Sequence, residues 1–166
     1  MNAVSSLSVL TLAHVFVSLA AIAAGFVVVF GMIAALDHPP INALFLTLTT
    51  LTSLTGFLFP FKGITPGIVL GILSLIVLAL AAIARYHGHL GKGWRGTYVI
   101  SALLALYFNF FVFVVQMFEK VSMLRAVAPT QTELPFTIIQ SIAFIAFAVL
   151  AILAFRRFHV RHAIGY

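Results

Sequence analysis

The stretch VFVSLAAIAAGFVVVFGMIAAL, residues 15–36, contains no charged residue. A helix needs about 20 apolar residues to cross the hydrocarbon core of a bilayer, so this stretch is long enough for one membrane-spanning helix. A cleaved signal peptide would have a basic segment before a shorter apolar run, but residues 1–11 contain no Lys or Arg. The stretch therefore predicts a first transmembrane helix that stays in the protein.

The composition of the whole chain agrees with this interpretation. Of its 166 residues, 63% are hydrophobic and 7% are charged, whereas soluble domains are about 45–50% apolar and about 25% charged. Nine Lys and Arg residues outnumber three Asp and Glu residues, but these bases are too scattered to form a face that follows nucleic-acid phosphates. We expect an integral membrane protein whose partners include membrane lipids and exclude nucleic acid.

Charged residues divide the chain into five long uncharged intervals. A charge at the bilayer centre costs about 2.5–3.5 kcal/mol, so each interval between charges is a candidate span. We expect one all-α domain over residues 1–166, a polytopic transmembrane helix bundle. Its predicted spans are Leu7–Leu36, Ile41–Phe59, Pro66–Ala84, Thr97–Phe118 and Phe136–Phe155.

The second predicted span, Ile41–Phe59, allows two arrangements. It carries six Ser or Thr hydroxyls and is flanked by prolines. It either crosses the bilayer as a helix, which gives five spans, or enters and returns on the same side as a re-entrant segment. The re-entrant arrangement has four spans and an N-terminus on the inner side.

The basic residues predict the orientation. Six of them fall on one predicted side of the membrane: Arg85, Lys92, Arg95, Arg156, Arg157 and Arg161. The other side has three: Lys62, Lys120 and Arg125. Loops rich in Lys and Arg stay in the cytoplasm, so five spans give a multi-pass inner-membrane protein with a cytoplasmic C-terminus. Arg85, Lys92 and Arg95 are expected to contact anionic lipid headgroups.

Polar side chains within the predicted spans are candidates for a ligand pocket. A carboxamide or imidazole in hydrocarbon must find a hydrogen-bond partner. With five spans, these residues fall in the central or outer half of the membrane and predict a polar pocket for a small solute or lipid. The alternative is that they form hydrogen bonds that fix helix packing. The candidates are His14, Thr52, Ser53, Thr55, Tyr107, Asn109, Gln116 and Gln140.

The histidines allow a different kind of site. Haem b held between helices needs two axial ligands at the same depth. With four spans, His14 lies on the inner side near His87 and His89 and the pair is possible, whereas five spans separate them. The chain has no cysteine and no catalytic set of acid, base and nucleophile at one depth. We therefore expect no enzyme activity, no metal site and no cofactor other than the haem b alternative.

Several segments resemble those of small bacterial inner-membrane proteins that have no assigned activity. They are TTLTSLTGF (49–57), FPF (59–61), ARY (84–86), WR (94–95), YFN (107–109) and APTQ (128–131). The resemblance implies a bacterial inner membrane. The histidine-bearing helices look more loosely like four-helix cytochrome b membrane proteins, which implies haem b. The resulting hypotheses are a solute- or lipid-binding bundle that acts as a homo-oligomer or subunit, a haem-binding redox protein, and a structural accessory subunit.

Overall fold

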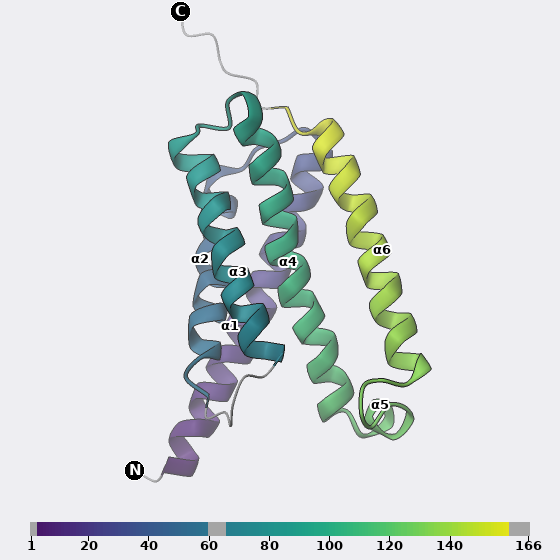
Figure 1. The fold of residues 1–166 in the computed structure, drawn as a ribbon. Coiled ribbons are helices and arrows are strands. Elements are labelled where there is room, and N and C mark those ends of the chain that lie inside the picture. The colour runs from purple at the N-terminus through teal and green to yellow at the C-terminus, as the bar shows by residue number, and fades with distance from the viewer. Residues whose placement is uncertain (1–2, 60–65, 160–166) are drawn as a thin grey trace, which may run out of the picture.

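The computed structural model describes residues 3–59 and 66–159, and all regular structure in these two ranges is helical (Figure 1). The elements are α1 (Ala3–Ile33), α2 (Pro39–Gly56), α3 (Pro66–Ala82), the π-helical turn η1 (Ile83–His87), α4 (Lys92–Lys120), α5 (Ser122–Val127) and α6 (Leu134–Arg157). The predicted all-α architecture is confirmed, and the ends of the five long helices lie within a few residues of the predicted ones.

Four helical stretches are long and apolar enough to cross a membrane. They are Val9–Ile33, Gly67–His87, Gly93–Lys120 and Leu134–Arg157. The chain is therefore an apolar helix bundle of the kind found in membranes. The helix α2 is not among the four, because its 18 residues include two prolines, Asn42 and six hydroxyls. The fifth span remains a prediction.

Helix α2 nevertheless packs along α1 as its antiparallel neighbour (Figure 1). The chain reverses at Ala35, whose φ of 58° is left-handed, and α2 begins where the Asn42 N–H donates to the His38 carbonyl at 3.0 Å. At the other end of α2, Thr55 Oγ1 lies 2.8 Å from His14 Nδ1 of α1. The two helices therefore stay together over the whole length of α2.

Gly25 permits the closest contact within the core. A Cβ atom added at Gly25 would lie 2.5 Å from Leu106 Cδ1 of α4 and 2.8 Å from Phe45 Cε2 of α2. Small residues at helix interfaces let backbones approach closely, and buried alanines surround this contact on α1 and α4. They are Ala21, Ala24, Ala102 and Ala105.

The described basic residues collect at two ends of the bundle. Arg85 in η1, Arg95 in the first turn of α4, and Arg156 and Arg157 in the last turn of α6 share the end that we call the basic end (Figure 1). Arg95 Nη1 donates to the Phe155 carbonyl at 2.8 Å, which satisfies a carbonyl at the end of α6 that has no helical partner.

The connection between α4 and α6 lies at the opposite end and contains α5 (Figure 1). None of the α5 side chains is buried. Beyond α5, the Glu133 carboxylate accepts hydrogen bonds from the Thr130 hydroxyl at 2.9 Å and the Thr132 N–H at 3.1 Å. Slight desolvation raises the pKa of Glu133, but its hydrogen bonds lower it more, so the net shift is downward. Glu133 is therefore ionised at the N-cap position of α6, and its carboxylate binds the loop before the helix.

Candidate functional site

A buried ion pair joins the turn between α1 and α2 to η1. Arg85 Nη2 donates to the two carboxylate oxygens of Asp37 at 2.9 and 3.1 Å. The Arg85 side chain is 6% exposed and the Asp37 side chain is 24% exposed. Arg85 points into the bundle, although its position in a basic loop suggested a lipid headgroup contact, because the Asp37 carboxylate compensates its charge there.

Asn42 and Tyr98 extend the ion pair into a network. Asn42 Nδ2 donates to Asp37 Oδ1 and to the His38 carbonyl, both at 2.9 Å. Tyr98 Oη of α4 donates to Asn42 Oδ1, and Arg85 Cζ lies 5.2 Å from the centre of the Tyr98 ring. The network thus links α2, η1, α4 and the α1–α2 turn at the basic end.

The π-helical turn η1 sets the position of Arg85. The Gly88 N–H donates to the Ile83 carbonyl five residues earlier at 2.8 Å, and such turns are frequent at functional sites. His89 and Leu90, which follow, have left-handed φ values of 47° and 55°. This conformation costs about 1–2 kcal/mol for a residue other than glycine, so the surrounding contacts must hold the turn in place.

A Tyr98→Phe substitution would leave Asn42 Oδ1 buried without its donor. We expect the free energy of unfolding to fall by about 1–3 kcal/mol, the cost of an unsatisfied buried polar group. Unfolding in mixed micelles, followed by circular dichroism, measures this change. Tyr86→Phe is the matched control, because Tyr86 is exposed in η1. Equal stability of the two variants would show that the Tyr98 hydroxyl contributes nothing.

Buried polar residues continue from this network along α2 and α4. Asn42, Thr49 and Ser53 are buried on α2, and their spacings of seven and four residues keep them on one face of the helix. Asn109 is buried on α4, eleven residues after Tyr98. Both helices start at the basic end and rise about 1.5 Å per residue. Ser53 and Asn109 therefore lie at a similar depth, about 16 Å below the contact between Asn42 and Tyr98.

Helix α3 adds Ser74, which is buried eleven residues before Arg85. We use the name polar column for this set of residues from the α1–α2 turn, α2, α3, η1 and α4: Asp37, Asn42, Thr49, Ser53, Ser74, Arg85, Tyr98 and Asn109. Two buried donors of the column, Arg85 Nη1 and Asn109 Nδ2, have no hydrogen-bond partner among the described residues. Buried polar groups in proteins are nearly always hydrogen-bonded. A polar ligand would therefore form its most favourable hydrogen bonds with these two atoms.

The predicted hydroxyl residues of α2 form hydrogen bonds within their own helix. Thr52 and Ser53 donate to the carbonyls of Leu48 and Thr49 at 3.0 and 3.1 Å. Thr55 donates to its own helix in the same way. These bonds use the hydroxyl hydrogens and leave oxygen lone pairs free to accept.

His14 lies at the end of the bundle opposite His87 and His89. Its imidazole contacts Thr55 in the last turns of α2 and lies edge-on to the Phe59 ring, with 5.2 Å between ring centres. His87 and His89 follow Arg85, which is joined to Asp37 just before α2 begins. The structure therefore does not bring together the two histidines on which the haem b alternative depends.

The remaining pocket candidates lie away from the polar column. Tyr107 packs against aromatic rings of α4 and α6. Gln140 of α6 donates to the Phe111 carbonyl of α4 at 3.2 Å, while Gln116 is exposed and donates to Glu119 at 3.3 Å. The structure thus brings His14 and Thr55 together, but it does not gather the eight predicted residues at one place, and the column includes only Ser53 and Asn109 from that set.

Sequence reasoning overlooked Asp37, Asn42 and Tyr98 as site residues. The sequence did contain one indication of the ion pair: Asp37 is an acid on the side of the membrane where the other predicted charges are basic. A buried or half-buried acid needs a basic partner, and Arg85 lies on the same predicted side. The contact with Tyr98 had no such signal, since aromatic residues near span ends also serve as interface anchors.

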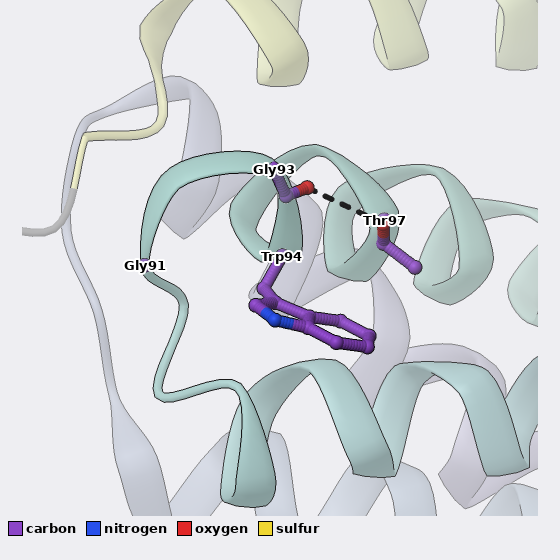
Figure 2. A pocket seen from close by; sticks show the side chains of 4 residues that line it. All are labelled: Gly91, Gly93, Trp94 and Thr97. Atoms are coloured by element: carbon purple, nitrogen blue, oxygen red, sulfur yellow. Dashed lines mark hydrogen bonds between the residues drawn. The ribbon is translucent and has the colours of Figure 1, made fainter.

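A shallow hollow lies beside the column at the basic end. It is lined by Gly91, Gly93, Trp94 and Thr97, and Figure 2 shows the Thr97 hydroxyl donating to the Gly93 carbonyl at 3.3 Å. A Cβ atom at Gly88 would lie 2.3 Å from Trp94 Cγ, so the indole packs directly on the Gly88 backbone. A second hollow, at the opposite end, is lined by Glu119, Lys120, Arg125, Pro129, Thr130 and Gln131.

Two other bases were expected at lipid headgroups. Arg95 Nη1 donates to the Phe155 carbonyl at the end of α6, and Arg95 Cζ lies 5.3 Å from the centre of the Phe155 ring. Lys92 begins α4, but its side chain lies outside the described part of the structure. The headgroup role of these residues remains a prediction.

No protein family, curated protein or solved structure matches this chain. The bacterial inner membrane implied by the resemblance therefore remains a prediction. What the protein does has to be inferred from the residues of the column.

Proposed function

We propose that the chain is a five-span inner-membrane bundle that binds or passes a small polar solute along the polar column. The observation that carries this proposal is the pair of buried donors without protein partners, Arg85 Nη1 and Asn109 Nδ2. A solute or water that accepts hydrogen bonds would satisfy either atom, one at each depth of the column. The proposal moves the solute from a pocket in the outer half to the buried polar residues of the column.

Two features of α2 support a fifth span. Its 18 residues give a length of about 27 Å, close to the roughly 30 Å of the hydrocarbon core. Asn42, Thr49 and Ser53 are buried. Leu44, Leu51 and Leu54 are exposed on the rest of its surface. This division suits a helix with protein on one side and lipid on the other. Five spans then give an outer N-terminus and a cytoplasmic C-terminus.

Cysteine accessibility tests whether the column admits solutes. The chain has no cysteine, so single replacements report their own positions alone. We expect Ser53→Cys and Asn109→Cys to react in proteoliposomes with a small hydrophilic methanethiosulfonate, because a wet column lets the reactive thiolate form. Ile145→Cys, on the exposed face of α6, is the control and should stay unreactive in lipid.

A second candidate function is that of a structural accessory subunit. It is favoured by hydrogen bonds that link helices directly, such as His14 to Thr55 and Gln140 to the Phe111 carbonyl. In this case the polar residues only fix helix packing. The cysteines at Ser53 and Asn109 would then be as unreactive as the one at Ile145, and the solute proposal would be wrong.

A further inference from the structure

Within the proposed function, on which this step rests, we infer that the solute of the polar column is a small anion. The two unpartnered atoms that mark the column are both N–H donors. A guanidinium offers donors and no acceptor, and the Nδ2 of a carboxamide is also a donor. An anion supplies only acceptors, whereas a cation supplies none, so the unmet hydrogen bonds match an anion.

The hydroxyls of the column do not reverse this preference. Thr49 and Ser53 donate their hydrogens to carbonyls of α2. Their oxygens keep lone pairs, which by themselves would favour a cation over an anion. A cation in a protein is usually held by carboxylates as well as by neutral oxygens. The carboxylate of the column, Asp37, is already paired with Arg85, so the neutral oxygens would have to act alone.

The distribution of charge around the column also favours an anion. Among the described acids, Asp37 lies at the basic end, whereas Glu119 and Glu133 lie at the opposite end. Arg85 and Arg95 lie at the basic end with the two arginines that end α6. At the opposite end Lys120 and Arg125 balance the two acids, so the basic end carries the excess of positive charge, which raises the local concentration of anions.

Arg85 carries the charge that an anion would meet inside the bundle. Helix dipoles do not add to it, because the N-termini of α2 and α4 and the C-termini of α1, η1 and α6 all lie at the basic end (Figure 1), and their partial charges of opposite sign offset one another. One guanidinium nitrogen of Arg85 is bound to Asp37, and Nη1 has no partner among the described residues. Hydrogen bonds from a charged donor are roughly twice as strong as neutral ones, which offsets part of the cost of removing an anion from water.

Flux through proteoliposomes containing the full chain tests this inference. Entry of chloride, potassium and urea is measured in parallel, with chloride-sensitive and potassium-sensitive dyes and by light scattering. We expect chloride to enter at least tenfold faster than potassium. Asn109→Leu, which removes an unpartnered donor without leaving another, should reduce chloride entry at least tenfold, and so should Arg85→Gln.

Gln140→Leu is the matched control, since Gln140 is also a buried carboxamide with an unpartnered atom among the described residues but lies between α4 and α6. It should leave chloride entry unchanged. Faster entry of potassium than chloride, or entry of urea without chloride, would overturn the anion inference and leave the proposed function standing. No entry of any of the three probes would also overturn the anion inference, and the proposed function would then be decided by the reactivity of the cysteines at Ser53 and Asn109. An equal loss of chloride entry in Gln140→Leu and Asn109→Leu would remove the column as the path.

Discussion

Asp37→Asn is expected to lower the free energy of unfolding by about 3 kcal/mol, because it leaves the Arg85 guanidinium buried without its counter-charge. Removing one partner of a buried ion pair costs about 3–5 kcal/mol. We expect the lower end of that range, since the Asp37 side chain keeps 24% of its surface exposed. Unfolding in mixed micelles, followed by circular dichroism, measures the change.

Glu119→Gln is the matched control for this substitution. It also neutralises an acid near the end of a helix. Glu119 is exposed, however, and among the described residues its carboxylate accepts one hydrogen bond, from Gln116. The double variant Asp37→Asn with Arg85→Gln should be more stable than the sum of the single changes predicts, because the unpaired charge is gone. Strictly additive effects would mean that the two residues contribute independently, and that the ion pair is not what holds the basic end together.

Gly25→Val is expected to destabilise the protein by about 2–3 kcal/mol through overpacking of the core. Its Cβ would already lie 2.5 Å from Leu106 Cδ1 and 2.8 Å from the Phe45 ring. Both neighbours are almost completely buried, with exposed fractions of 0% and 1%, so neither has free space to move into. The midpoint of unfolding in mixed micelles measures the effect.

Gly93→Val provides the comparison, because a Cβ atom at Gly93 would have no neighbour within 4 Å. Leu106→Ala tests the cause, since it removes the Cδ1 atom that the new side chain would meet. We expect Gly25→Val to cost less in a Leu106→Ala background than alone. The close contact of α1 with α4 would be refuted by a Gly25→Val protein as stable as Gly93→Val.

Together these results would connect the architecture with the proposed path. The ion pair of Asp37 with Arg85 ties the α1–α2 turn to η1 at the basic end, and the contact at Gly25 keeps α1 close to α4. Loss of the ion pair is therefore expected to affect both stability and flux. Loss of the Gly25 contact acts on stability, because Gly25 contributes no polar group to the column.

The helices of this protein follow from its sequence because the cost of placing a charge in lipid acts on each residue, whatever its neighbours in space. The five uncharged intervals 1–36, 38–61, 63–84, 96–118 and 134–155 were enough to predict the long helices to within a few residues. The same rule separated the bases into two groups. It left α2 ambiguous, since hydroxyls are tolerated both in spans and in re-entrant segments.

The partners of the polar residues depended on the tertiary structure. Asp37 and Arg85 are 48 residues apart, and their contact depends on the turn at Ala35 and on the π-helical turn that extends α3 beyond its predicted end. The contact of Asn42 with Tyr98 depends on the rotation of α2 and α4 about their axes. Packing of side chains over the whole bundle fixes these turns and rotations, so no local pattern contains them. The amino-acid sequence determined which segments form long apolar helices, and the packing determined which polar groups meet between them.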